Sequence, residues 1–409
     1  MTNMFRILVA SLLATLLVAG AQAQVVPPPP KAAMPTPAAP TLGARSYVLM
    51  DFESGQLIVA DDPDLRVEPA SITKLMTGYV IFNEIAQGNI SLDERVPVSE
   101  TAWRTGGSRM FIEPGMEVSV SDLLRGMIVQ SGNDASVLLA ERAAGSEEAF
   151  STLMNHYAEQ LGLVNTHFVN ATGMPAENHY TTARDVALLS AAIIRHFPDF
   201  YTIYSEKEFS FKPDSRNEPI RQHNRNTLLW RDPAVDGLKT GHTESAGYCL
   251  ASSAARDGMR LISVVMGSSS ENQRAADSQA LLSYGFRFFE TVKLYEGGQE
   301  LADARVWRGE AENVKLGLAD PLVITIPRGR YDDLEARMEL TPRLTAPLAD
   351  GEAVGELHVS LDDERIAERP LVTLAAVPEA GFFGRNWDSF KLWVGGFFED
   401  DEEGQADGG

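Results

Sequence analysis

The order of hydrophobic patterns along the 409-residue chain constrains its fold more than any other feature. Residues 44–60 carry two short apolar runs on either side of turn residues, a pattern that predicts a β-hairpin. From about residue 71 to 199 the apolar residues mostly recur at helical spacing. Strand patterns return over 247–266, joined by an Asp-Gly turn, and a helical pattern follows. Strands at both ends of a helical stretch predict one antiparallel sheet flanked by helices, an α+β domain over residues 44–290.

A different pattern begins after residue 290 and predicts a second domain. Short runs of alternating apolar and polar residues, such as those over 322–326 and 357–361, are separated by turn residues. This pattern is typical of short β-strands. We therefore expect a small all-β domain over residues 291–378.

The segment over residues 379–398 predicts an amphipathic helix, followed by an acidic tail over 399–409. Its apolar face carries Trp387, Phe390, Val394 and Phe397. Such a helix lies on a membrane surface or docks on its own β-domain, and both alternatives fit the pattern. Only Arg385 and Lys391 are basic in this segment, and anionic lipid headgroups would repel the acidic tail. We expect a membrane anchor that depends on apolar burial, with docking as the alternative.

The N-terminus predicts an exported protein. Residues 1–23 have the form of a secretory signal, with Arg6, an apolar stretch over 7–20 and a small-residue cleavage site. Because the apolar stretch is too short to span a bilayer comfortably, we expect cleavage after residue 23, with an uncleaved anchor as the alternative. Residues 24–43 are rich in Pro and Ala and predict a linker.

The composition excludes several classes of protein. The chain has 35 basic and 57 acidic residues and a formal net charge of −22, so we exclude nucleic acid as a partner. Its single cysteine, Cys249, forms no intrachain disulfide, and we expect it to be a small buried apolar residue. The seven histidines are not spaced as metal-ligand pairs, so the sequence predicts no metal and no cofactor.

Ser71 and Lys74 form the first of three polar motifs. If a helix begins at Ser71, residues three apart share a face, and the Lys74 amine can reach the Ser71 hydroxyl. A serine becomes a strong nucleophile when a base takes its proton. A lysine can be that base when burial or neighbouring cations lower its pKa. The pair is a candidate nucleophile and base, although Ser-x-x-Lys on its own is a common pattern.

The second motif, Ser131-Gly132-Asn133, interrupts two helical patterns. Small residues at such a break let side chains project into a cleft. Ser131 can relay a proton to a leaving amine, and the Asn133 amide can hold a substrate carbonyl and Lys74. A helix cap or a turn is the alternative for this motif taken by itself.

The third motif consists of Lys239, Thr240, Gly241, His242 and Thr243, and it leads into a strand pattern. Its cation and hydroxyls can bind a substrate carboxylate, and its glycine lets a ligand backbone approach closely. This motif therefore favours a peptide C-terminus as ligand.

The set of three motifs, in this order, resembles that of the penicillin-binding proteins and class A β-lactamases. The amino-acid sequences over residues 69–77, 130–135 and 235–243 are similar to those of the low-molecular-mass penicillin-binding proteins. These are the serine D-alanyl-D-alanine carboxypeptidases of peptidase family S11, and the resemblance extends over nearly the whole chain.

The resemblance implies a penicillin-recognising catalytic domain, a β-rich second domain and a C-terminal anchor. The enzyme would lie in the periplasm, peripheral on the outer face of the inner membrane. It would remove the terminal D-alanine from peptidoglycan pentapeptides through an acyl-enzyme, and β-lactam antibiotics would inhibit it covalently.

The resemblance also implies roles for single residues. Ser71 would be acylated, Lys74 would accept its proton, and Ser131 would be the third catalytic group. Lys239 would contact the substrate carboxylate, and the backbone N–H groups of Ser71 and His242 would form an oxyanion hole.

Two further positions are similar to family positions near the carboxylate pocket. These are Arg225 and Arg274, for which an ordinary surface arginine is the alternative. The segment over 103–114 looks shorter than in well-known relatives, which leaves the rim of the cleft and its substrate preference open.

Other functions fit parts of the sequence. A β-lactamase shares the acylation step, but class A enzymes use a glutamate in deacylation, and no Glu-x-x-Leu-Asn segment follows Ser131. A DD-endopeptidase would use the same residues and remains open. The non-enzyme alternative is an inactive cell-wall-binding scaffold, against which the intact Ser71 and Lys74 argue.

Overall fold

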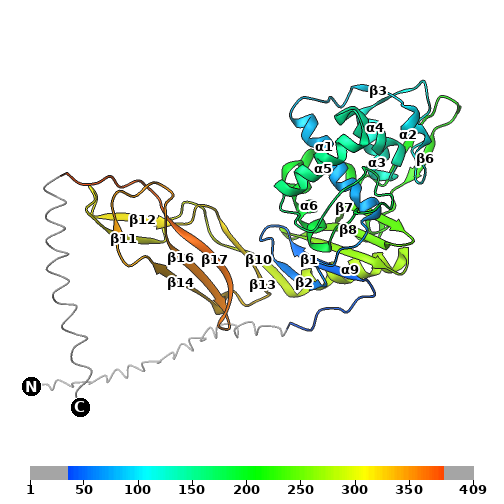
Figure 1. Cartoon of the computed structure of the whole chain (residues 1–409). Helices are drawn as coiled ribbons and strands as arrows, with labels where there is room; N and C mark the ends of the chain where they lie inside the picture. The colour runs from blue at the N-terminus through cyan, green and yellow to red at the C-terminus, as the bar shows by residue number, and fades with distance from the viewer. Residues whose placement is uncertain (1–35, 382–409) are drawn as a thin grey trace, which may run out of the picture.

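The structure is a computed structural model that describes residues 36–381. Figure 1 shows a rounded body that contains the described α-helices and an elongated body made of strands. The predicted signal peptide, most of the linker, nearly all of the 379–398 segment and the acidic tail lie outside the described residues. Within residues 36–381 no helix has both the length and the apolar character needed to cross a membrane.

The rounded body is built on a five-stranded antiparallel sheet with the strand order β2-β1-β9-β8-β7. Its strands are β1 (Ser46–Asp51), β2 (Leu57–Asp61), β7 (Val235–Thr243), β8 (Gly247–Arg256) and β9 (Met259–Ser268). The turn between β8 and β9 places Asp257 and Gly258 at φ 50° and 82°, as a two-residue hairpin turn requires. Because β1 pairs along its whole length with β9, the N-terminal hairpin does join the later strands. The predicted α+β fold is confirmed.

The other elements of this body are mostly helical. They are η1 (Ala70–Thr73), α1 (Lys74–Ala86), β3 (Arg95–Pro97), α2 (Glu100–Arg104), β4 (Glu117–Ser119), α3 (Val120–Val129), α4 (Asn133–Ala144), α5 (Glu147–Gln160), α6 (Ala183–His196), α7 (Pro198–Tyr201), η2 (Thr202–Ser205), β5 (Glu208–Phe211), β6 (Ile220–His223), α8 (Leu228–Arg231) and α9 (Glu271–Phe288). Five of the helices begin after a hydroxyl residue that accepts a backbone N–H, namely Ser99 before α2, Ser119 before α3, Ser146 before α5, Thr182 before α6 and Ser270 before α9. Such caps satisfy donors that the first helical turn leaves free.

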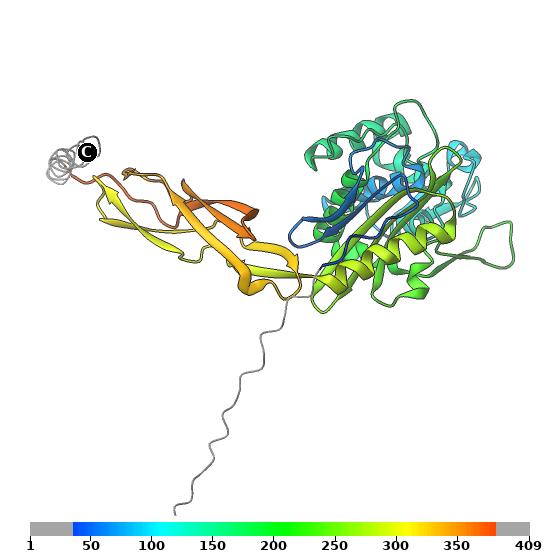
Figure 2. The ribbon, with the colours of Figure 1, turned by 90° about the horizontal axis from the view of Figure 1, so that it is seen from below.

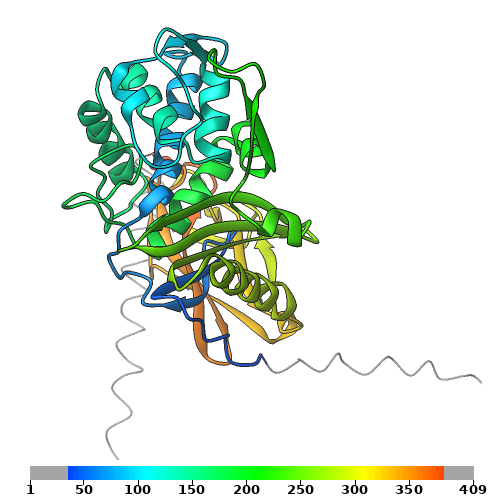
Figure 3. The ribbon, with the colours of Figure 1, turned by 90° about the vertical axis from the view of Figure 1, so that its right-hand side faces the viewer.

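Helices cover both faces of the sheet, as Figure 3 shows. On one face Gly285 of α9 lies so close to the sheet that a Cβ there would approach Leu261 to 2.5 Å and Leu49 to 2.8 Å. Since side chains alternate along a strand, Val48 and Met50 point to the opposite face. There they belong to the larger core, together with buried side chains of α1 and α6.

The elongated body contains two sheets. One pairs β10 (Phe289–Tyr295) with β13 (Leu322–Pro327), and the other has the order β14-β16-β17-β12-β11-β15. The remaining elements are β11 (Ala302–Trp307), β12 (Asn313–Gly317), η3 (Tyr331–Asp333), β14 (Leu334–Leu340), β15 (Leu344–Thr345), β16 (Ala353–Leu361) and β17 (Glu364–Thr373). Alternate residues such as Leu357, Val359 and Leu371 are buried in its core. The predicted all-β second domain is confirmed.

The two bodies are joined directly, as Figure 2 shows. α9 ends where β10 begins, with no residue between them. Asp51, fully buried at the end of β1, accepts a hydrogen bond from the Thr291 hydroxyl at 2.5 Å. The hydroxyls of Ser54 and Thr325 lie 2.6 Å apart. The β1–β2 hairpin is therefore bonded to both β10 and β13.

Candidate active site

Ser71 and Lys74 meet at the beginning of α1. Ser71 lies in the 3-10 turn η1, which leads directly into α1 at Lys74. The Lys74 Nζ atom donates a hydrogen bond to the Ser71 hydroxyl over 3.0 Å. The local helical geometry therefore brings the two side chains together, as their three-residue spacing predicts.

Lys74 is fully buried among neutral acceptors. Besides Ser71, its Nζ atom donates to the Asn133 side-chain oxygen at 2.7 Å and to the Thr172 carbonyl at 2.6 Å. Burial, with a smaller contribution from the positive charge of Arg225, lowers the pKa of Lys74 to about 7. A substantial share of this lysine is therefore uncharged near pH 7, and that form can accept a proton from Ser71.

Ser131 lies in the break between α3 and α4. Its φ of +67° is a left-handed backbone conformation that interrupts the helical path. Its hydroxyl is buried and has no hydrogen-bond partner among the residues that the structure describes. The same residue lines a pocket with Ser71. Because an unpaired buried hydroxyl is costly, Ser131 is placed to bond a ligand in that pocket.

Asn133 and Asp134 hold a neighbouring loop against the site. The Asn133 side-chain nitrogen donates to the Gly106 carbonyl at 2.8 Å. The buried Asp134 carboxylate accepts the backbone N–H groups of Met110 at 3.0 Å and Phe111 at 2.9 Å. The sequence assigned no role to Asp134, although a carboxylate directly after the second motif and inside an apolar helical pattern was a usable signal.

β7 supplies another wall of the site. It is the edge strand of the sheet and packs on η1, where a Cβ on Gly241 would lie 3.0 Å from the Pro69 carbonyl oxygen. Thr240, Gly241 and His242 line the pocket. The Lys239 side chain is buried, and its Nζ atom donates to the Thr240 carbonyl at 3.2 Å. Burial, followed by the charges of neighbouring cations, lowers the pKa of Lys239 well below its ordinary value.

Two arginines and a glutamate complete the pocket. Arg225 and Arg274 both line it, Arg225 with an exposed side chain and Arg274 with a buried one. Arg274 is buried and donates to the Glu271 carboxylate at 2.9 Å. Its guanidinium lies 5.6 Å from the centre of the Tyr248 ring, and the His242 ring stacks on the same tyrosine at 4.0 Å. No sequence motif points to Glu271 or Tyr248.

The pocket that joins these groups has a volume of about 320 Å³. Its lining consists of Ser71, Ser108, Ser131, Arg225, Thr240, Gly241, His242, Tyr248, Glu271 and Arg274. The buried Lys74 and Lys239 adjoin this lining, and positive side chains outnumber the Glu271 carboxylate, which suits a ligand with a carboxylate group. Thr243 is not among the lining residues, and its hydroxyl accepts the Ala246 N–H at 3.0 Å.

A loop between α5 and α6 packs against the turn that carries Ser71, and no sequence motif points to this loop. His179 Nε2 lies 2.8 Å from the Thr73 hydroxyl, and His179 Nδ1 accepts the Val169 N–H at 3.0 Å. This network assigns the ring proton to Nε2, and burial lowers the pKa of His179 to about 4. At Gly173, with φ +83°, a Cβ would lie 1.8 Å from the Ala70 carbonyl oxygen. The loop therefore touches the turn that carries Ser71.

Two family models match the chain. The one described as D-alanyl-D-alanine carboxypeptidase matches residues 33–270, and the one described as penicillin-binding protein 5, C-terminal domain, matches residues 289–379. The chain is also 46% identical over 371 residues to D-alanyl-D-alanine carboxypeptidase DacA of Escherichia coli K12. That alignment covers 88% of this chain and 91% of the relative.

Solved structures agree with this relationship. Penicillin-binding protein 5 from Haemophilus influenzae is 45% identical, with a TM-score of 0.80, and the match covers 84% of this chain and 100% of that one. Penicillin-binding protein D2 from Listeria monocytogenes is 28% identical, with a TM-score of 0.55, and the match covers 61% of this chain and 100% of that one. The fold, the family and the enzyme class that the sequence predicts are confirmed. The chain therefore belongs to the serine D-alanyl-D-alanine carboxypeptidases, the penicillin-binding proteins of peptidase family S11.

Proposed function

We propose that Ser71, Lys74 and Ser131 carry out the carboxypeptidase reaction on the terminal D-Ala-D-Ala of peptidoglycan pentapeptides. The observation that carries this proposal is the 3.0 Å hydrogen bond between a buried lysine with a lowered pKa and the Ser71 hydroxyl. The substrate carboxylate would enter a pocket lined by Arg225 and Arg274, and its negative charge would favour the protonated form of the adjoining Lys239, so that Lys239 and Arg225 hold it by charge-assisted contacts.

Acylation begins when uncharged Lys74 takes the Ser71 proton as the Ser71 oxygen attacks the carbonyl carbon of the penultimate D-alanine. The carbonyl oxygen becomes an oxyanion, and backbone N–H groups of Ser71 and His242, both pocket residues, stabilise it. The carbon–nitrogen bond then breaks. The leaving D-alanine amine receives the proton held by Lys74, relayed by the Ser131 hydroxyl.

Deacylation uses the same groups. A water molecule attacks the ester carbon of the acyl-enzyme while Lys74 accepts a proton from that water. The bond between the acyl carbon and the Ser71 oxygen breaks, and the proton returns to Ser71. The products are a peptide shortened by one residue and the free enzyme.

Release of D-alanine from a peptide that ends in D-Ala-D-Ala tests the assignment of the nucleophile. We expect Ser71→Ala to abolish release, because no other group in the pocket is paired with Lys74 in this way. The matched control is Ser205→Ala, which removes an exposed hydroxyl and leaves release unchanged. Equal release from Ser71→Ala and the unchanged protein would refute the mechanism.

The same acylation step predicts a stable adduct with β-lactam antibiotics. The solved structure of penicillin-binding protein D2 from Listeria monocytogenes contains bound ampicillin, which supports this step in a related pocket. Mass spectrometry after incubation with penicillin should show one antibiotic mass added to the unchanged chain and none added to Ser71→Ala. An inactive cell-wall-binding scaffold would gain no mass.

We further propose that residues 1–23 are a cleaved signal peptide, that 24–43 are a linker and that the enzyme works in the periplasm. Residues 379–398 would rest on the outer face of the inner membrane, and the acidic tail over 399–409 would extend into water. Support for this arrangement comes from the sequence patterns. Deleting residues 379–409 should move the protein from the membrane fraction to the soluble periplasmic fraction. An unchanged membrane fraction would contradict the anchor.

A further inference from the structure

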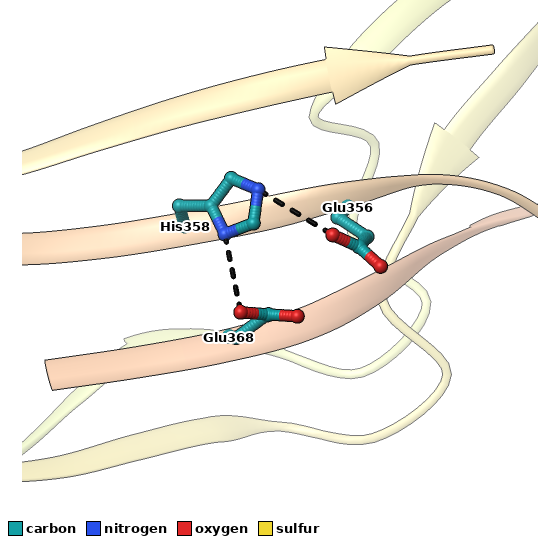
Figure 4. A group of neighbouring side chains, drawn as sticks. All are labelled: Glu356, His358 and Glu368. Carbon is teal, nitrogen blue, oxygen red and sulfur yellow. Dashed lines mark ion pairs between the residues drawn. The ribbon is translucent and has the colours of Figure 1, made fainter. Parts of the chain in front are cut away.

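A cluster of titratable side chains lies on the second domain, on the hairpin formed by β16 and β17. Glu356 and His358 are two residues apart on β16, so their side chains point to the same side of the sheet. Glu368 on β17 is the cross-strand partner of His358, and Glu339 on β14 is the partner of Glu356. Figure 4 shows the imidazole ring between the carboxylates of Glu356 and Glu368.

The imidazole ring of His358 faces a carboxylate on each side. Its Nε2 atom lies 3.5 Å from Glu356 and 3.7 Å from Glu339, and its Nδ1 atom lies 3.6 Å from Glu368. These distances exceed those of N–H···O hydrogen bonds, which are about 2.7–3.2 Å. The His358 side chain is only 11% exposed, and its Nδ1 atom is buried with no hydrogen-bond partner in the described part of the chain.

The spacing of these groups is that of ligands around a metal ion. A ring nitrogen of His358 and one oxygen each from Glu356 and Glu368 all lie within 4.8 Å of one another. A tetrahedral zinc ion with bonds of about 2.0–2.2 Å to nitrogen and oxygen separates its ligand atoms by about 3.4 Å. The three ligand atoms lie within 4.8 Å of one another, so side-chain rotations that bring them closer by up to about 1.4 Å would close the site.

The charges of the cluster also favour a cation. Glu339 and Glu356 are like charges directly opposite each other on neighbouring strands, an arrangement that destabilises a sheet. Neither has a Lys or Arg partner among residues 36–381, whereas Glu368 has Arg365 at 2.6 Å. Arg337, the partner of His358 on β14, is paired with Glu335 at 2.8 Å, so neither arginine neutralises Glu339 or Glu356, and a bound divalent ion would remove the repulsion between them.

We propose that Glu356, His358 and Glu368 form a binding site for a divalent transition-metal ion such as Zn²⁺, with Glu339 at its edge. One imidazole nitrogen and two carboxylate oxygens are donors that zinc accepts. With Nδ1 on the ion, Nε2 faces the Glu339 carboxylate at 3.7 Å, and a carboxylate is the usual outer partner of a metal-binding histidine. The sequence predicts no metal because its histidines are not spaced as ligand pairs, whereas this site has one histidine and ligands from adjacent strands.

The ion would act as a clamp on the second domain. It would connect β16 to β17. Because the side chains of Glu356 and Glu368 are 54% and 45% exposed, water can reach the ion and complete its coordination. The site is in the elongated body and Ser71 is in the rounded one, as Figure 1 shows for β16, β17 and α1. Binding should therefore raise thermal stability without changing acylation of Ser71 by penicillin.

Calorimetric titration of the chelator-treated, secreted chain with zinc chloride tests the proposal. We expect one zinc ion per chain and a higher melting temperature with zinc. His358→Gln should remove both effects, and Glu356→Gln, at an exposed position, should weaken binding at least about tenfold. The matched control is His223→Gln, because His223 is an exposed strand histidine with one carboxylate, Glu208, at 3.8 Å. It should bind zinc as the unchanged protein does.

Acylation by penicillin in each variant verifies that the chain is folded. The proposal is overturned if the unchanged protein takes up no zinc at millimolar concentration, which would make the cluster a solvated group of charges. It is equally overturned if folded His358→Gln or Glu356→Gln binds zinc with unchanged affinity.

Discussion

Asn133 accepts a hydrogen bond from Lys74 over 2.7 Å, so an uncharged amide, not a carboxylate, holds the proposed base. The other two acceptors of the Lys74 ammonium are the Ser71 hydroxyl and the Thr172 carbonyl. This neutral surrounding matters because a carboxylate in contact would stabilise the charged form of the lysine. The amide of Asn133 would therefore help to keep the pKa of Lys74 low, in addition to its role in packing.

Replacing Asn133 by Asp should move the acid limb of the activity profile to higher pH. The new negative charge favours protonated Lys74 and raises its pKa by about one unit or more, which lowers the fraction of free base at pH 7. The rate of acylation by penicillin, measured from pH 5 to 10, should fall at least about fivefold at pH 7 and recover in alkali. Asn217→Asp adds the same charge at an exposed loop position and should leave the profile unchanged. A profile of Asn133→Asp that coincides with that of the control would contradict this role.

The unchanged enzyme should lose acylation activity as the pH falls through about 7. Burial lowers the pKa of Lys74 to about 7, so the amine is protonated below that value and cannot accept the Ser71 proton. The rate should fall about tenfold for each further pH unit. Stopped-flow measurement with a chromogenic β-lactam gives this profile. A rate that stays constant from pH 7 to pH 5 would exclude Lys74 as the base.

Gly173→Ala should damage both stability and acylation. A Cβ at this position would lie 1.8 Å from the Ala70 carbonyl oxygen, so the loop that accepts the Lys74 hydrogen bond would have to move away. The matched control is Gly145→Ala, because Gly145 has nearly the same φ, +82°, with nothing within 4 Å of a Cβ. We expect the control to lose about 1–2 kcal/mol in the free energy of unfolding, from backbone strain alone, and to keep full acylation. Urea unfolding and penicillin labelling of both variants check this, and equal losses would show that the clash is not important.

The free energy of unfolding should fall as the pH drops from about 6.5 to about 4, with His179 as one cause. Its pKa is about 4 in the folded chain, against an ordinary value of 6.5, so the unfolded chain binds more protons across this window. The contribution is complete above pH 6.5 and amounts to at most about 3 kcal/mol.

Urea unfolding at pH 7.5 and pH 4.5 measures this effect. His179→Gln should be less stable than the unchanged protein at pH 7.5 and nearly equal to it at pH 4.5. His156→Gln, at an exposed position, should show the full dependence on pH. An unaltered pH dependence in His179→Gln would assign the effect to other groups.

The fold and the first contacts of the site could be predicted because both follow from repeating geometry. Alternation and helical spacing indicated which segments are strands and helices, and the later strands needed a further partner, which the N-terminal hairpin supplies by pairing with β9. The distance between Ser71 and Lys74 follows from one helical turn. Convergence of the three motifs was expected from the resemblance to a family, and the pocket brings Ser71, Ser131 and Thr240 together.

The loop beneath the site could not be predicted, because it acts through its backbone. The Thr172 carbonyl that accepts the Lys74 hydrogen bond is a backbone group, which a residue of any type could supply. A single glycine such as Gly173 can occupy its position for many different structural reasons. The sequence does contain one signal for a partner at this place. Thr73, the last residue of η1, and Thr77 in the first turn of α1 are four residues apart and both buried, and buried hydroxyls need partners. They find them in His179 at 2.8 Å and in the Ala171 carbonyl at 2.7 Å.

The uninterrupted passage from α9 into β10, bonded at its side through Asp51 and Thr291, makes the second domain a strut of set length. One nine-residue strand such as β16 already spans about 30 Å at about 3.3 Å per residue. If the proposed anchor over residues 379–398 holds the far end of this strut, it would fix the distance from the membrane at which Ser71 acts. Peptide stems within that layer of the wall would then be trimmed, and those nearer to or farther from the membrane would be out of reach.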